Sequence, residues 1–119
     1  MSGLVSRLLG RSRPDEEDVT AEVATALGQV PGVIDFDVAY NHLQYSSGAL
    51  SGVVDVDGTA TFEHVLRVSY DALRRRLGAD ADRVVVYLTG RTADGAAITP
   101  EHLGLPQRPT GSDLARRYA

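Results

Sequence analysis

The sequence contains no cysteine and no lysine, and each absence excludes particular chemistry. Without cysteine the chain can form no disulfide, thiolate metal site or cysteine nucleophile. Without lysine it has no Schiff-base lysine, lysine general base or phosphate-loop lysine, and all 12 basic residues are arginine. Apolar runs are short, and residues 1–13 fall far below the ~20 apolar residues that span a bilayer.

The overall composition is that of one ordinary globular domain. The chain has 119 residues, of which 43% are hydrophobic and 24% charged, and this length allows one real core. The net charge is −4, so we expect no nucleic-acid partner. The sequence shows no repeat and no low-complexity tract, and we expect a cytoplasmic protein, bound at most peripherally to a membrane.

The N-terminal segment, residues 1–13, is basic and amphipathic. Its apolar residues fall at helical spacing, and they are Leu4, Val5, Leu8 and Leu9. Arginines stand around them at Arg7, Arg11 and Arg13. Such a segment can rest on a membrane surface or in a partner's groove. It can equally be a frayed terminus or a helical turn docked on its own domain.

Two helices are expected after this segment. Pro14, followed by four acidic residues, is typical of a helix start, and Gly28 with Pro31-Gly32 ends that helix. Residues 59–77 carry an apolar stripe on one side and alternating charges on the other, and Gly78 is the expected cap. Both segments therefore predict amphipathic helices that cover a sheet.

The strands are predicted by alternation of apolar and polar residues. Residues 33–42 and 50–57 alternate and form a hairpin, in a register that pairs Ile34 with Val56 and Phe36 with Val54. Residues 83–89 form a third strand. A crossover from the second strand predicts the order 2-1-3, with all strands antiparallel. The expected fold class is α+β, a two-layer sandwich with element order α-β-β-α-β and both helices on one face of a three-stranded antiparallel sheet.

A C-terminal extension follows the predicted core. Asp94-Gly95 indicates a turn, Thr99-Pro100-Glu101 a first helical turn, and Ser112-Asp113 the cap of a short helix that ends at Tyr118. We therefore divide the chain into the N-terminal segment 1–13, a core domain of residues 14–91 and an extension of residues 92–119.

The uncovered face of the predicted sheet carries an acidic cluster. Four aspartates are expected to lie together there: Asp35, Asp37, Asp55 and Asp57. Because like charges opposite each other are destabilising, we expect compensation from Arg91. The cluster can be a solvated rim, can dock a basic partner, or can hold a divalent cation through oxygen ligands. Val85 and Tyr87 on the same face favour a protein contact, and Tyr118 of the extension is a further candidate.

The three histidines, at positions 42, 64 and 102, have no close metal-ligand spacing. We therefore expect no metal centre and no cofactor.

Two short strings resemble motifs of the haloacid-dehalogenase-like phosphatases. Residues 53–59, with Asp55 and Asp57, resemble the first motif, and residues 86–91, with Thr89, resemble the second. The resemblance implies Asp55 as nucleophile, Asp57 as acid/base and Thr89 as phosphate ligand, with magnesium to offset charge. The lysine of that family's third motif is absent, and the chain is too short for its five-stranded parallel sheet.

The element order also resembles that of the BON domains, small bacterial modules associated with membrane or lipid binding. The resemblance covers residues 18–90 and includes the glycine-flanked strand at residues 48–56.

We therefore predict a small non-catalytic binding or assembly module. It would act through the open sheet face and the C-terminal extension, on a protein partner or a second copy of the chain. A phosphoryl-transfer enzyme and a peripheral membrane module are the alternatives.

Overall fold

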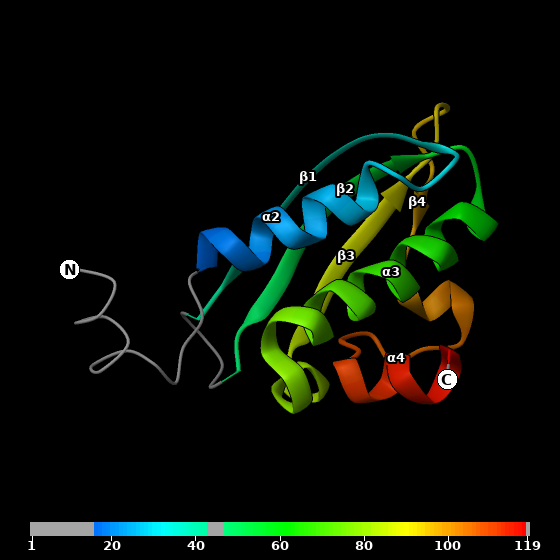
Figure 1. Cartoon of the computed structure of the whole chain (residues 1–119). Coiled ribbons are helices and arrows are strands. Elements are labelled where there is room, and N and C mark those ends of the chain that lie inside the picture. Colours follow the sequence, from blue (N-terminus) through cyan, green and yellow to red (C-terminus); the bar gives the residue numbers. More distant parts are fainter. Residues whose placement is uncertain (1–15, 43–46, 119) are drawn as a thin grey trace, which may run out of the picture.

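The computed structural model describes residues 16–42 and 47–118. Its regular elements lie in the order α-β-β-α-β, followed by a β4 strand and further helical turns (Figure 1). They are α2 (Glu16–Leu27), β1 (Val33–Asn41), β2 (Ala49–Val56), α3 (Thr59–Leu77), the 3₁₀-helix η1 (Gly78–Arg83), β3 (Val85–Arg91), β4 (Ala97–Ile98), the 3₁₀-helix η2 (Pro100–Leu103) and α4 (Gly111–Tyr118). The α+β class and the position of α3 are as the sequence predicts.

The four strands form one mixed sheet in the order β1-β2-β3-β4. β1 and β2 are antiparallel, β2 and β3 parallel, and β3 and β4 antiparallel. The predicted three-stranded antiparallel sheet of order 2-1-3 is therefore wrong. β3 runs in the expected direction but lies beside β2, and the 2-residue β4 adds a fourth strand.

Side chains of α2 occupy the outer edge of β1, where the third strand was expected. The N–H of Tyr40 donates to Thr20 Oγ1 at 3.0 Å, and the N–H of His42 donates to Glu16 Oε2 at 2.6 Å. A strand paired at this edge would have to displace both side chains from these backbone donors, and β3 pairs with β2 instead.

The predicted hairpin forms, with one local change of register. Phe36 lies opposite Val54 as expected, but Val33, not Ile34, lies opposite Val56. An irregularity between Val33 and Asp35 leaves Ile34 unpaired, as in a β-bulge. Ile34 is consequently 66% exposed, although its place in the alternation predicted a core position.

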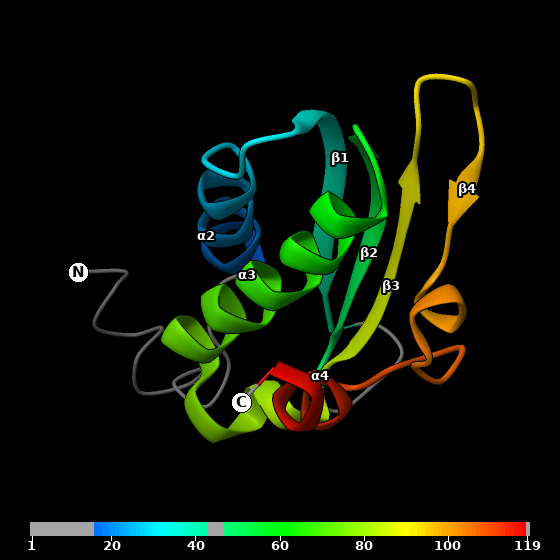
Figure 2. The same ribbon diagram turned by 90° about the vertical axis from the view of Figure 1, so that its right-hand side faces the viewer.

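The core lies between one face of the sheet and the helices α2 and α3 (Figure 2). Both predicted apolar stripes are buried: from α2 these are Val19, Val23 and Leu27, and from α3 they are Phe62, Val65, Leu66, Ser69 and Leu73. The Gly90 backbone lies so close to α3 that an added Cβ would meet the Phe62 ring at 2.8 Å. Glycine at this point of β3 lets the helix layer approach the sheet.

The C-terminal extension closes the outer edge of β3 at both ends. β4 pairs with the last residues of β3, and near its start Val86 N–H donates to the Pro109 carbonyl at 2.8 Å. α4 then packs against α3 and η1. Leu105 and Leu114 of the extension belong to the buried core, Leu114 with no exposed surface.

α2 and α3 are joined by a two-arginine clamp on one carboxylate. The Nε atoms of Arg75 and Arg76 each lie 2.9 Å from a different oxygen of Glu22. Arg75, one of the alternating charges on the exposed side of α3, thus binds across to α2. The hydrogen bond from Arg75, and then that from Arg76, lowers the pKa of Glu22 below its ordinary value of 4.5.

This lowered pKa predicts an acid-dependent loss of stability. A carboxylate whose pKa is lower when folded stabilises the fold above its unfolded pKa, and this contribution is lost as pH falls through the folded pKa. We therefore expect Glu22→Gln to reduce stability at pH 7 and to flatten its decline below about pH 4.5. Urea unfolding from pH 7 to below about pH 4.5 measures the free energy of unfolding of each variant. A carbon-detected titration of the Glu22 carboxyl measures its pKa. Glu101→Gln is the control, and an equal flattening in that variant would contradict the assignment.

Candidate functional site

One face of the sheet is left uncovered by α2 and α3. Val54, Val56, Val86 and Leu88 point into the core, so their strand neighbours point to the other side. The strand registers arrange these neighbours in rows across β1, β2 and β3, and the row that contains Ala49 and Val85 is largely buried. The three more exposed rows are Asp35–Asp55–Arg91, Asp37–Val53–Thr89 and Ala39–Ser51–Tyr87, and we call them the open sheet face.

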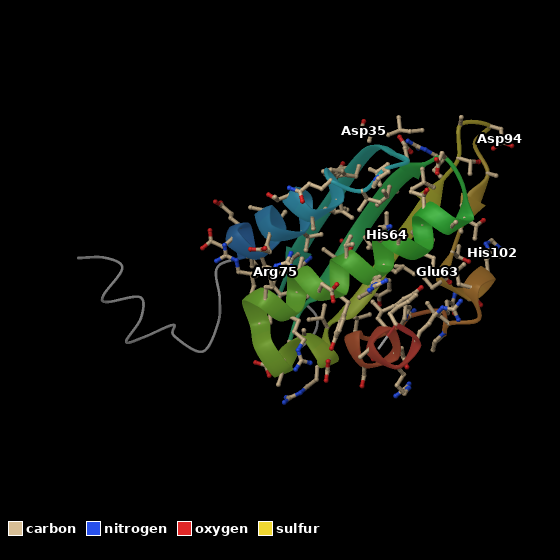
Figure 3. The ribbon with its side chains drawn as sticks, turned by 45° about the vertical axis from the view of Figure 1, so that its right-hand side comes forward. Asp35, Glu63, His64, Arg75, Asp94 and His102 are labelled. Carbon is tan, nitrogen blue, oxygen red and sulfur yellow. The ribbon has the colours of Figure 1, made fainter. Side chains whose placement is uncertain are left out.

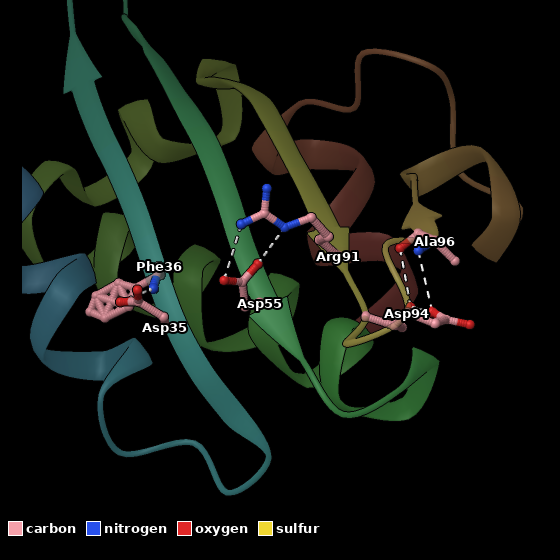
Figure 4. A network of polar contacts seen from close by, with 7 residues as sticks. Asp35, Phe36, Asp55, Arg91, Asp94 and Ala96 are labelled. Atoms are coloured by element: carbon pink, nitrogen blue, oxygen red, sulfur yellow. Dashed lines mark hydrogen bonds and ion pairs between the residues drawn. The ribbon is translucent and has the colours of Figure 1, made fainter.

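One aspartate of this face is neutralised by an arginine. Arg91 donates from Nε to Asp55 Oδ1 at 2.8 Å and from Nη2 to Oδ2 at 3.2 Å (Figure 4). This two-point contact with Asp55 is the main cause that raises the pKa of Arg91. Arg91 is the compensating charge expected from the sequence, but it reaches Asp55 from the strand next to β2.

The other two aspartates of the open sheet face have no such arginine. Asp35 is exposed directly opposite Asp55, and its Oδ1 accepts the neighbouring Phe36 N–H at 2.8 Å. Asp37 is exposed opposite Val53. Among the ion pairs of the described residues, neither carboxylate takes part in one. The face therefore presents two carboxylates without a close arginine contact, although Asp35 still interacts electrostatically with Arg91.

Asp57 does not join the other three aspartates. It lies beyond the last residue of β2, and its Oδ1 accepts a hydrogen bond from Thr61 Oγ1 in the first turns of α3. An added Cβ on Gly32 would lie 2.7 Å from the same oxygen. The expectation that four acids cluster is thus correct for three of them, because the fourth follows the turn into the helix.

The other predicted contact residues are divided between different surfaces. Tyr87 is half-buried on the open sheet face, with the Arg108 guanidinium 5.9 Å from its ring centroid. Val85 is 9% exposed at the start of β3, where it bridges to Thr110. Tyr118 lies on α4 against α3, where burial raises the pKa of its hydroxyl. Val85 lies on the same side of the sheet as Tyr87 by alternation but is buried, so Tyr87 is the one of these three that is partly exposed on the face.

Two exposed apolar side chains accompany the aspartates. Val53 is 38% exposed at the centre of the open sheet face, between Asp37 and Thr89. Ile34 is turned outward by the bulge beside Asp35. Sequence reasoning missed Ile34, because only the pairing register reveals a bulge, and it also missed Arg108.

The sheet edges are less available than its face. Along the outer edge of β1 and directly after it, side chains accept the N–H groups of Phe36, Tyr40 and His42. The outer edge of β3 is occupied by β4 and by residues 109–111. Capped or covered edges of this kind resist pairing with a further strand.

The histidines are dispersed, and two of them form local contacts. His42 Nε2 lies 3.0 Å from the Tyr40 hydroxyl, and His102 Nδ1 accepts the Thr99 N–H at 3.1 Å. His64 on α3 and His102 on η2 stand apart (Figure 3). Within residues 16–42 and 47–118, no group of three or more acidic or histidine side chains is arranged to hold a metal ion.

The residues that resemble phosphatase motifs do lie at neighbouring strand ends. β2 and β3 are parallel, and Asp55 stands directly opposite Arg91 in their register. A hollow of about 320 Å³ lies along the outer edge of β3, and one of about 460 Å³ lies between α2 and α3. Asp55 and Asp57 line neither of these hollows. Asp55 instead lies on the open sheet face, held by Arg91.

In the part of the chain that the structure describes, no helix is both long enough and apolar enough to cross a membrane. The N-terminal segment and its four apolar residues, Leu4, Val5, Leu8 and Leu9, lie outside the described residues. Comparison of the chain with protein families, with characterised proteins and with solved structures finds no match.

Proposed function

We propose that the chain is a small non-catalytic binding module whose open sheet face takes a basic, partly apolar protein segment. The observation that carries this proposal is the exposed Val53 beside the exposed Asp37, which, like Asp35, forms no ion pair with an arginine of the described residues. An apolar centre beside unpaired carboxylates suits a partner with apolar side chains and flanking arginines or lysines.

The mode of binding follows from the state of the strand edges. Adding a strand to β1 would have to displace the Thr20 and Glu16 side chains from its backbone N–H groups. Side-chain contacts across the face require no such exchange. The C-terminal extension contributes Arg108, which lies over Tyr87 at the border of the face.

Symmetric pairing of two open sheet faces is disfavoured by their charge. A two-fold contact would bring Asp35 and Asp37 of one copy against the same acidic surface of the other. Such like-charge contacts oppose association. A basic segment on a different protein, or on a different part of a chain, meets the same face with opposite charge.

A library of random peptides selected against the full chain tests the proposal. We expect enriched peptides to carry arginine or lysine beside apolar residues. Their affinity should fall about fivefold for the double variant Asp35→Asn/Asp37→Asn, since two exposed ion pairs are worth roughly 0.5 kcal/mol each. Asp71→Asn/Asp80→Asn removes the same charge from exposed positions on α3 and η1 and is the matched control.

Two results would contradict this function. One is selection of peptides that bind both double variants and the parent equally well. The other is magnesium-dependent hydrolysis of a generic phosphate ester that Asp55→Asn abolishes, since it would assign Asp55 to catalysis.

A further inference from the structure

We infer that the first occupant of the open sheet face is the N-terminal segment of the same chain, residues 1–13. This inference rests on the proposed function, because it names a ligand for the same surface. A partner would then have to displace the chain's own segment, so the segment would lower the apparent affinity of the module.

The charges of the segment and the face are complementary. Residues 1–14 contain three arginines and no acidic residue. The face presents Asp35 and Asp37 without an ion pair among the described residues. Opposite charges across a contact favour association and fix its orientation. The three arginines of the segment are thus opposite in charge to Asp35 and Asp37.

The apolar residues also correspond. The segment carries leucine and valine side chains at helical spacing; the face carries the exposed Val53, and the exposed Ile34 adjoins Asp35 at the bulge of β1. Covering apolar surface contributes about 25 cal/mol for each Å² removed from water. Electrostatic attraction favours association of the segment with the face, and burial of these apolar side chains stabilises the contact.

The path from α2 to the face is short. Glu16, the first residue of α2, binds the backbone N–H of His42, so the chain enters beside the end of β1. β1 is the outermost strand of the sheet, so the segment has one strand edge to pass. From Asn41 to Asp37 is four residues, or ~13 Å along a strand. The four residues from Asp15 back to Arg11 span about the same distance when extended.

The tether favours the chain's own segment over that of a second copy. A short flexible link holds a ligand at an effective concentration in the millimolar range. Intramolecular contact therefore dominates at micromolar protein concentrations. A weak contact suffices, and it leaves the face open to a stronger partner.

Disulfide trapping in the full chain tests the contact, because the natural sequence has no cysteine to interfere. The variant Leu8→Cys/Val53→Cys places one thiol on the segment and one at the centre of the face. The control Leu8→Cys/Arg67→Cys places the second thiol on the exposed side of α3. Under a mild redox buffer we expect the monomeric disulfide to form with about tenfold higher yield in the first variant.

Charge exchange provides the second arm of the experiment. Adding Asp35→Arg/Asp37→Arg to the trapping variant should remove the excess yield, and further adding Arg7→Asp/Arg11→Asp should restore it. Equal yields at Val53 and Arg67, or disulfides between chains alone, would overturn the inference. So would flotation of the full chain on anionic vesicles that Leu8→Ser abolishes, because it would assign the segment to a membrane surface.

Peptide binding separates this inference from the proposed function. If both hold, Arg7→Asp/Arg11→Asp frees the face, and selected peptides should bind that variant about threefold more tightly. Peptides that bind parent and variant equally would overturn the inference and leave the proposed function standing. Trapping at Val53 without any peptide binding would contradict an external partner and support the internal contact.

Discussion

Replacing Gly52 by alanine is expected to lower the free energy of unfolding by about 3 kcal/mol or more. Gly52 lies in the middle of β2 with φ +148°, a conformation that side chains rarely adopt. A Cβ built there would lie 2.1 Å from the Asp37 carbonyl oxygen and 2.7 Å from the Val38 Cα. Both atoms belong to the backbone of β1, so the clash is relieved only by separating the strands of the hairpin.

Two glycines serve as matched controls for this substitution. Gly95 also has positive φ, at +88°, but an added Cβ would meet nothing within 4 Å. Gly28 does not have positive φ, and its Cβ would be in ordinary contact 3.5 Å from the Ala24 carbonyl oxygen. We expect Gly95→Ala to cost about 1 kcal/mol and Gly28→Ala to be close to neutral.

Urea unfolding followed by far-ultraviolet circular dichroism measures all three variants. A loss for Gly52→Ala no larger than that for Gly95→Ala would show that the close approach of β1 and β2 is absent. Because the open sheet face is built on this hairpin, its rows of residues would then need a different register.

Leu114→Ala is the second large effect, with an expected loss of 2–5 kcal/mol. Leu114 is fully buried on α4 and belongs to the same core as α2, α3 and the sheet. Its truncation would leave a cavity where the C-terminal extension meets the rest of the domain. We expect unfolding to remain a single transition, because the extension shares one core with the preceding elements.

Local contacts explain why α4 is held firmly enough for this effect. Gly111 N–H donates to the Val84 carbonyl at 2.9 Å, and an added Cβ at Gly111 would lie 1.9 Å from the Ala81 carbonyl oxygen. Asp113 and Thr110 cap the start of the helix, with Thr110 N–H donating to Asp113 Oδ2 at 2.9 Å. The start of α4 is thus held close to η1, and Leu114, one turn later, is buried in the core.

Leu103→Ala, at a half-buried position in η2, is the control, and it should cost less than half as much. Equal losses in the two variants, or a separate early transition in Leu114→Ala, would show that α4 folds apart from the core. The same urea unfolding measurement decides between these outcomes.

Elements set by local pattern were predicted well. The apolar stripe and the terminal glycine predict a helix at residues 59–77, and α3 spans Thr59–Leu77. The alternation in β1 and β2 also predicts their pairing and the facing of Asp35 and Asp55. Periods of 3.6 and 2 residues are properties of single elements, so the sequence carries them directly.

The candidate site was predicted in part for the same reason. Alternation places Asp35, Asp37 and Asp55 on one face, but it does not say where a strand ends. Asp57 therefore lies outside the cluster and contacts α3. Tyr118 lies on α4, which packs against α3 on the helix side of the sheet. A bulge likewise interrupts the alternation without a signal in the residue types, which is why Ile34 is exposed.

The sequence by itself determined what chemistry the chain lacks and which side chains share a strand face. Having neither cysteine nor lysine, it can form no disulfide and no lysine-based site, and its alternating aspartates make one sheet face acidic. Only the tertiary structure decided that β3 lies beside β2 and that Arg91 therefore binds Asp55. The reason is that strand order depends on contacts between segments distant in the sequence. Side chains of α2 occupy the outer edge of β1, and the residue pattern of β3 carries no information about that edge.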